Sequence, residues 1–277
     1  MKKKEIRVCI MRVGGTNCDA ETKRAFDDLG VKAEIVHLNE MVKKGNLLDY
    51  NALVFPGGFS YGDYVRAGAI WAKGIQAKLR ACMHACDLIR FVEEGRPVLG
   101  ICNGFQVLVE AGLLPGFEGI SEYPEAALAT NVPIGYHCNW VYIKCENSGK
   151  CLFAQKIQKG KVLRIPVAHA EGRFLFPKEK ADRYLKRLYD NDQLVFRYCD
   201  ENGKHANGVY PINPNGAFHD IAGICDSTGT IFGLMPHPER AYYSWQLPDW
   251  TKEEKMPKHG DGRLVFESMI EYLRKKS

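Results

Sequence analysis

Short apolar segments alternate with amphipathic helical patterns through the first 112 residues of the chain. Four of these segments are rich in β-branched residues and have the length of strands: "IRVCIMRV", "KAEIVHL", "ALVFPGG" and "PVLGI". Helical patterns occupy residues 20–29, 68–94 and 103–112. Strands that alternate with helices in this way form parallel sheets through right-handed crossovers. The alternation therefore predicts an α/β fold, with helices on both faces of a mostly parallel sheet.

The pattern changes after Gly116. Strand-like segments now follow one another with turn sequences such as "NPNG" and "DSTG" between them, which predicts antiparallel additions to the sheet. These segments are "HCNWVYIKC", "KVLRIPVAH", "QLVFRYC", "IAGICDS" and "TIFGLMPH". The last segment, "DGRLVFESMIEYLRKK", has apolar residues at helical spacing. No Pro-, Gly- or Ser-rich linker interrupts the chain, so we expect one domain over residues 1–277.

The charge of the chain is modest. It has 38 Lys and Arg against 33 Asp and Glu, and its lysines are dispersed apart from short runs at the two ends. A nucleic-acid-binding surface would show basic residues interleaved with aromatic ones on one face, so no nucleic-acid partner is expected. The apolar run in "MKKKEIRVCIMRV" is too short for a signal peptide or a membrane span. We expect a cytoplasmic protein without membrane contact.

The ten cysteines do not indicate a disulfide framework, because small secreted scaffolds have a much higher cysteine fraction. Most are expected to be buried as small apolar side chains. Cys82, His84 and Cys86 lie two residues apart on a predicted helix, so their side chains point in different directions. No second pair with metal-ligand spacing follows them, and no metal site is expected.

Cys102 stands between Gly100 and Gly104 where a predicted strand gives way to a predicted helix. A residue at such a sharp turn adopts strained backbone geometry, and small neighbours give it clearance. The helix N-terminus favours a thiolate over a thiol, and the Asn103 N–H could hold the oxyanion of a tetrahedral intermediate. The alternative is a buried cysteine with packing glycines. The glycine pattern alone does not separate the two.

A nucleophilic cysteine needs a base and a group that orients the base. His237 lies between two prolines in "GLMPHPERA", and Glu239 projects to the same side of this restrained segment. A neighbouring carboxylate fixes the tautomer of an imidazole and supports its protonated form. The alternative is a rigid surface turn with an incidental histidine. Gly57 and Gly58, after another predicted strand, suggest a second oxyanion donor because a ligand can approach their backbone closely.

"GICNGFQVLVEAGLLPG" together with "MPHPERA" resembles the class I, or triad-type, glutamine amidotransferases. Further segments are similar to the glutaminase subunits of phosphoribosylformylglycinamidine synthase, the PurQ family: "PGGFSYGDYVRAGAI", "PVAHAEGRF", "NPNG" and "DIAGI". The resemblance extends from about Val8 to about Tyr272. It implies a flavodoxin-like amidotransferase fold and a role in purine biosynthesis.

The resemblance also implies a role for each matching residue. Cys102 would attack the side-chain amide of glutamine, His237 would transfer the protons, and Glu239 would orient His237. A glutamyl thioester on Cys102 would then be hydrolysed by water. The N–H groups of Gly58 and Asn103 would form the oxyanion hole. The residues implied in substrate binding are Gly57, Gln106, His169 and Glu171.

The family passes ammonia to a synthetase subunit, PurL, which uses ATP and Mg²⁺. In complexes of separate subunits, a small third subunit, PurS, bridges the two. The present chain has no G-x-x-x-x-G-K-[ST] sequence, so a separate partner is implied and no cofactor is expected in this chain.

The sequence departs from the family pattern at Gly14, usually proline, at Ala170, usually glycine, and at Asn139, where arginine is common. The chain also looks extended at residues 72–89 and 118–133 and in an aromatic insertion over residues 242–260. The insertion could contact the synthetase partner, or it could fold back on its own domain.

Two rival classes of function remain. The first is another cysteine hydrolase on the same kind of sheet, such as an amidotransferase for a different synthetase, or a DJ-1-type peptidase or chaperone. These lack the combination of "PGGFSYGDY" with "MPHPER". The second is a non-catalytic scaffold subunit that has lost activity. Such a subunit would have lost Cys102, His237 or Glu239, and all three are present.

Overall fold

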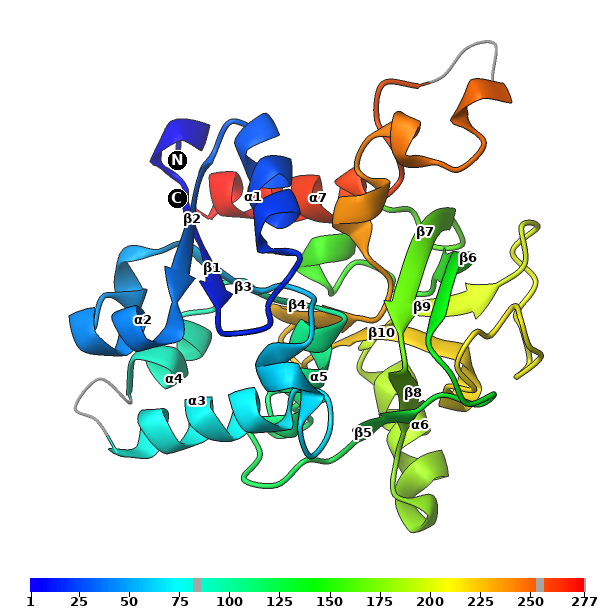
Figure 1. Ribbon diagram of the computed structural model, residues 1–277, viewed down its shortest axis with the longest axis horizontal. Coiled ribbons are helices and arrows are strands. Elements are labelled where there is room, and N and C mark those ends of the chain that lie inside the picture. The colour runs from blue at the N-terminus through cyan, green and yellow to red at the C-terminus, as the bar shows by residue number, and fades with distance from the viewer. Residues whose placement is uncertain (82–85, 253–256, 277) are drawn as a thin grey trace.

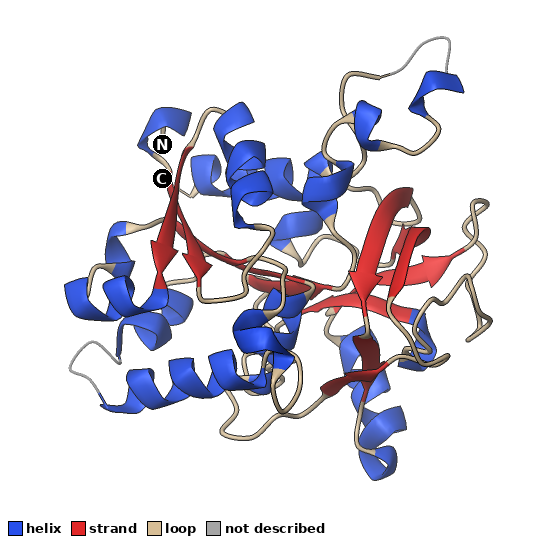
Figure 2. Cartoon of the chain, in the orientation of Figure 1, coloured by secondary structure: helices blue, strands red, loops and turns tan. Residues whose placement is uncertain are grey.

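A nine-stranded sheet crosses the whole molecule in the computed structural model, which describes residues 1–81, 86–252 and 257–276 (Figures 1 and 2). The strand order is β2-β1-β3-β4-β11-β10-β9-β6-β7. The strands of this sheet are β1 (Arg7–Arg12), β2 (Lys32–His37), β3 (Ala52–Phe55), β4 (Val98–Ile101), β6 (His137–Cys145), β7 (Val162–His169), β9 (Leu194–Cys199), β10 (Ile221–Cys225) and β11 (Ile231–Leu234). A separate antiparallel pair is formed by β5 (Ala127–Thr130) and β8 (Glu171–Leu175).

The two halves of the sheet have the predicted directions. Strands β1, β2, β3 and β4 pair in parallel, and β6, β7, β9 and β10 pair antiparallel. β11 joins the halves: it is antiparallel to β10, as expected, but parallel to β4. In this pairing Leu234 lies opposite Ile101. The segments that follow β4 and β11 therefore emerge at the same edge of the sheet.

Helices cover both faces of the sheet (Figure 1). α1 and α7 pack together on one face, where Phe26 and Phe266 meet edge to face at 5.1 Å. α3 and α5 pack together on the other face. The helices are α1 (Asp19–Asp28), α2 (Leu38–Lys44), α3 (Ala69–Ala81), α4 (Cys86–Glu93), α5 (Asn103–Glu110), α6 (Ala181–Asp190) and α7 (Arg263–Lys275).

The helices agree with the sequence pattern in outline. The helix expected over residues 68–94 is two helices, α3 and α4, and α2 was not predicted. Cys82 and His84, considered above as metal ligands, lie outside the described residues, as does the side chain of Cys86. Among the helices that the structure describes, none combines the length and the apolar character needed to cross a membrane.

Candidate active site

Cys102 occupies the sharp turn between β4 and α5. Its backbone has φ 50° and ψ −105°, a positive φ that non-glycine residues rarely adopt. Its N–H donates to the Leu234 carbonyl of β11 at 2.8 Å, and its carbonyl accepts from the Gln106 N–H at 3.1 Å. Two hydrogen bonds therefore hold the strained residue, and its side chain is buried at the N-terminus of α5.

The glycines beside Cys102 have the predicted steric role. A Cβ atom on Gly104 would lie 1.9 Å from the Phe55 carbonyl oxygen of β3. A Cβ atom on Gly100 would lie 2.7 Å from the Gly104 carbonyl oxygen. Both distances are far below van der Waals contact, and both involve backbone that cannot easily move. The close approach of α5 to β3 and β4 therefore requires glycine at these positions.

His237 and Glu239 follow β11 and form a buried pair. The Nδ1 atom of His237 lies 2.6 Å from Oε1 of Glu239, and each residue is only 2% exposed. Glu239 belongs to a short 3-10 helix, Pro238–Ala241, and the His237 N–H donates to the Pro166 carbonyl of β7 at 2.8 Å. The turn is therefore buried, and the alternative of a surface turn with an incidental histidine is wrong.

The charges around His237 favour its protonated form. Burial alone would lower the pKa of His237, but the negative charges of Glu239 and Cys102 outweigh burial and raise this pKa well above its usual value. The Nε2 atom of His237 is buried and has no hydrogen-bond partner among the described residues. Glu239 holds Nδ1, so Nε2 is the ring nitrogen that remains unpaired with the described residues.

Gly57 and Gly58 lie at the same edge of the sheet. A Cβ atom on Gly57 would lie 2.7 Å from Cε1 of His237, so this glycine packs directly against the imidazole. Gly58 has φ +148° and pairs with Thr16 in an isolated bridge. Within the described part of the chain, neither the Gly58 N–H nor the Asn103 N–H donates a hydrogen bond. Both donors are free to bind an oxyanion, and their role stays a prediction.

The side chain of Gln106 is buried, and both its amide nitrogen and its amide oxygen bond to protein groups. Its Nε2 donates to the Glu171 carbonyl oxygen, and its Oε1 accepts from Nδ2 of Asn103 at 2.9 Å. Oδ1 of Asn103 in turn accepts from the Ser60 N–H at 3.3 Å. These bonds connect α5, β8 and the "FSYGD" loop. The predicted contact of Gln106 with substrate remains a prediction.

His169 and Glu171 flank the β7–β8 turn. The His169 ring is buried against Gly172, and its Nδ1 lies 3.2 Å from Oδ1 of Asn131. Burial, together with the positive charges of His237 and His137, lowers the pKa of His169 to about 3. His169 is therefore neutral at physiological pH. Glu171 accepts the Ala67 N–H at 3.0 Å.

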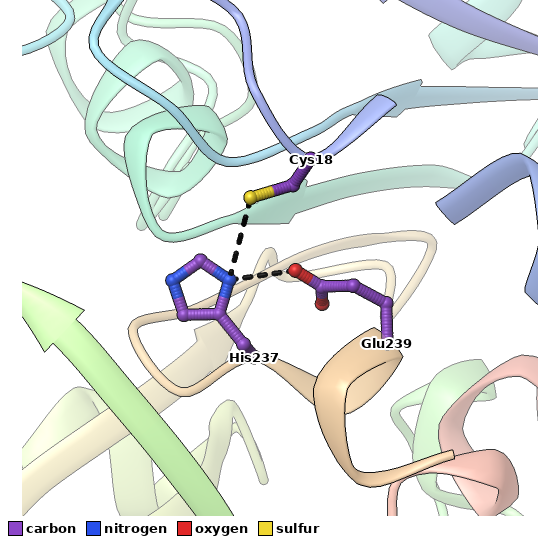
Figure 3. Close-up of side chains that lie close together, drawn as sticks. All are labelled: Cys18, His237 and Glu239. Atoms are coloured by element: carbon purple, nitrogen blue, oxygen red, sulfur yellow. Dashed lines mark hydrogen bonds and ion pairs between the residues drawn. The ribbon is translucent and has the colours of Figure 1, made fainter. Parts of the chain in front are cut away.

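Cys18 is a site residue that the sequence analysis missed. Its Sγ lies 3.9 Å from Nδ1 of His237 (Figure 3). Nη2 of Arg240 donates to this sulfur at 3.3 Å. Cys18 follows β1, whose carboxyl end lies at the same edge of the sheet as those of β3 and β4. The position of Cys18 in "GGTNCD", just after a predicted strand of the parallel sheet, could have indicated that it lies near the site.

The described part of the aromatic insertion, residues 242–252 and 257–260, makes contacts with its own chain. Nε2 of Gln246 donates to the Glu239 carbonyl oxygen at 3.1 Å, and Nη1 of Arg164 donates to both carboxylate oxygens of Asp249 at 2.9 Å. Trp245 and Trp250 nevertheless remain 53% and 47% exposed. A contact between these rings and a partner stays a prediction.

The three departures from the family pattern cause no clash. A Cβ atom on Gly14 would meet no atom within 4 Å. Ala170 is exposed between β7 and β8, and Asn139 is exposed on β6 opposite Val167.

Comparisons with known proteins agree with this geometry. Residues 5–273 match the model of the CobB/CobQ-like glutamine amidotransferase domain. Phosphoribosylformylglycinamidine synthase subunit PurQ of Archaeoglobus fulgidus is 48% identical over 99% of this chain and 100% of its own length. The PurQ subunit of Methanococcus maripaludis is 44% identical over 97% of this chain and 98% of its own. A chain in the structure of PurLQS from Thermotoga maritima is 31% identical, with a TM-score of 0.70, over 97% of this chain and 99% of that one. The chain therefore belongs to the CobB/CobQ-like glutamine amidotransferases and, within them, to the PurQ subunits of phosphoribosylformylglycinamidine synthase.

Proposed function

We propose that the chain hydrolyses glutamine to glutamate and ammonia through a triad of Cys102, His237 and Glu239. The observation that carries the proposal is the parallel pairing of β4 with β11, which brings the Cys102 and His237 turns to one edge of the sheet. Nδ1 of His237 is held at 2.6 Å by Glu239, and this leaves Nε2 for Cys102.

The proposed reaction begins from a Cys102 thiolate and a His237 imidazolium. The thiolate attacks the side-chain amide carbon of glutamine, and the resulting oxyanion accepts from the N–H groups of Gly58 and Asn103. His237 donates its Nε2 proton to the amide nitrogen, the C–N bond breaks, and ammonia leaves behind a glutamyl thioester. His237 then takes a proton from water, which attacks the thioester and releases glutamate and Cys102.

Four residues are proposed to form the walls of the substrate site: Gly57, Gln106, His169 and Glu171. The neutral state of His169 limits its role, because a neutral imidazole can exchange hydrogen bonds but cannot balance the substrate's carboxylate charge. Gln106 fixes the position of α5 relative to β8 through its bonds to Asn103 and the Glu171 carbonyl. We propose that it shapes the substrate site by this route.

The relatives suggest the destination of the ammonia. They are named PurQ subunits, and the solved assembly is PurLQS. We propose that this chain passes ammonia to a PurL-type synthetase subunit and that a PurS-type subunit bridges them. Ammonia that escapes into water becomes protonated and loses its nucleophilicity, so a sheltered path is needed. ATP and Mg²⁺ would act on the synthetase, this chain would need no cofactor, and the complex would work in the cytoplasm.

Glutamate release tests the proposal. The purified chain is incubated with glutamine, alone and with the synthetase partner and its substrates, and Cys102→Ala is the control. We expect release that depends on Cys102 and rises when the partner is present. Intact glutamine in a correctly assembled complex would contradict the proposal and favour the scaffold class.

A further inference from the structure

A second cysteine packs against the catalytic imidazole. Cys18 is 2% exposed, and its Sγ approaches the same nitrogen of His237 that Glu239 holds (Figure 3). Sγ, Nδ1 and a carboxylate oxygen of Glu239 all lie within 4.8 Å of one another. The mechanism above assigns no role to this sulfur, although it is adjacent to the proposed base.

Cys18 is held from several directions. Its N–H donates to the Gly57 carbonyl at 3.1 Å, and its carbonyl accepts from Oγ1 of Thr22 at 2.6 Å. Arg240 donates through Nη2 to the sulfur at 3.3 Å and through Nε to Oε1 of Glu21 at 2.9 Å. The position of Sγ is therefore fixed by groups outside the triad.

Gly57 closes the space on the other side. A Cβ atom on this glycine would lie 3.1 Å from Sγ of Cys18 and 2.7 Å from Cε1 of His237. The glycine backbone, the sulfur and the imidazole are therefore in mutual contact. Such packing restricts rotation of the imidazole about its Cβ–Cγ bond, which would move Nε2 away from Cys102.

The chemistry of Cys18 excludes two other roles. Burial raises the pKa of Cys18 to about 12, so the residue is a neutral thiol and not a second nucleophile. A metal ion also does not fit. Nδ1 and Oε1 are 2.6 Å apart, whereas two ligands of a tetrahedral zinc ion lie about 3.3 Å apart. The Arg240 guanidinium at the sulfur would repel a cation.

We propose that Cys18 is a positioning residue for His237, in which its sulfur packs on the imidazole and accepts weakly from Nδ1–H of the imidazolium. This proposal rests on the proposed function, since it gives His237 the role of base. The titratable groups that act on or pack against His237 come from several elements and include Glu239, Arg240, Cys18, Cys102, His169 and Tyr136. Among them, Cys18 and Glu239 contact Nδ1.

Loss of the sulfur has a defined consequence. Without it the imidazolium loses an acceptor and gains freedom to rotate, so the Cys102 thiolate loses part of its counter-charge. The thiolate then forms at a higher pH, and the imidazolium is lost at a lower pH. The pH range in which both ions coexist becomes narrower from both sides.

The test follows alkylation of Cys102 by iodoacetamide as a function of pH, with mass spectrometry of the Cys102 peptide. The full chain is used as wild type, Cys18→Ala and Cys145→Ala. Cys145 is a matched control because it is buried and its sulfur donates to backbone carbonyls, those of Asn147 and Ile157, away from the triad. For Cys18→Ala we expect the midpoint of alkylation to rise by about 0.5 to 1 pH unit, which slows alkylation below that midpoint by about 3- to 10-fold. The control stays within about 2-fold of wild type.

Coincident profiles for wild type and Cys18→Ala would overturn the proposal. If the alanine variant fails to fold, Cys18→Ser carries the test, because its hydroxyl keeps an acceptor but fills less space. We expect a shift in the same direction and about half as large, and no shift would overturn the proposal. Alkylation does not involve glutamine. A normal Cys18 effect with no glutaminase activity would therefore reject the proposed function alone.

Discussion

The Cys102 turn and the His237 turn lie at the ends of adjacent parallel strands, but different interactions hold them. The Cys102 turn is fixed by tight backbone packing, in which Gly100 lies against Gly104 and Gly104 lies against the Phe55 carbonyl of β3. The His237 turn is held by side chains, those of Cys18 from a distant segment and of Gln246 from the insertion that follows Glu239. The nucleophile is thus positioned by close backbone packing between elements, whereas the base is positioned mainly by side chains. Substitutions at the Cys102 turn should therefore abolish activity, whereas substitutions around the His237 turn should reduce activity by different amounts.

The largest effect is expected from Gly104→Ala. The new Cβ atom would lie 1.9 Å from the Phe55 carbonyl, so α5 must move away from β3 and carry the Cys102 turn with it. We expect a loss of about 3 kcal/mol or more in the free energy of unfolding and no measurable glutaminase activity. Denaturant unfolding measures the first quantity. Gly14→Ala is the matched control, since its Cβ atom meets nothing within 4 Å. Equal stability of the two variants would refute the account of the first turn.

Glu239→Gln tests the second turn at its centre. Burial lowers the pKa of His237, and without the Glu239 charge only Cys102 and the weak acceptor Cys18 oppose this effect. Since the folded-state pKa falls, the imidazolium is lost at lower pH, and the alkaline limb of the activity profile moves down. We expect kcat to fall about 100-fold at neutral pH. A pH profile of kcat/KM with an unmoved alkaline limb would show that Glu239 does not support the imidazolium.

The pH dependence of stability gives a third test, which concerns His169, one of the residues proposed to line the substrate site. The pKa of His169 is lowered to about 3 in the folded protein, against about 6.5 in an unfolded chain. Between these values the unfolded state binds the extra proton, so His169 reduces stability progressively as pH falls from about 6.5 toward 3. We expect His169→Gln to lose less stability than wild type over this range. Urea unfolding at several pH values measures this. Curves of unfolding free energy against pH that run parallel for wild type and His169→Gln would contradict the lowered pKa of His169.

The smallest effect is expected from Gln246→Ala, at the rim of the His237 turn. The variant loses two hydrogen bonds, one from Nε2 to the Glu239 carbonyl and one that Oε1 accepts from the Tyr243 N–H. We expect kcat to fall about 3- to 10-fold and stability to fall by about 1 kcal/mol. Gln76→Ala is the control, because it removes the same kind of bond, from Nε2 to the Ala111 carbonyl, away from the triad. If both variants keep full activity, the insertion does not support the base.

The sequence was sufficient for features that depend on near neighbours. The alternating half of the chain predicted a parallel sheet, and the glycines around Cys102 predicted a crowded strand-to-helix turn. His237 and Glu239 could be paired because they are two residues apart between prolines. These predictions needed only periodicity and local steric limits.

Features that depend on long-range packing could not be predicted in the same way. The parallel pairing of β11 with β4 joins segments that are more than a hundred residues apart in the chain. Cys18 and His237 are separated by 219 positions, and no local pattern marks their contact. The bond from Gln246 to the Glu239 carbonyl spans only seven residues, but it lies in irregular structure that no periodic pattern predicts.

The central claim is that Cys102 forms a covalent bond to the glutamyl group. Acid quenching of the assembled complex during turnover, followed by mass spectrometry of the Cys102 peptide, tests it most directly. The account predicts a glutamyl adduct on Cys102 that is absent in Cys102→Ala and accumulates when water attack is slowed. Turnover of glutamine by the Cys102→Ala complex, with no adduct on the wild-type peptide, would contradict it.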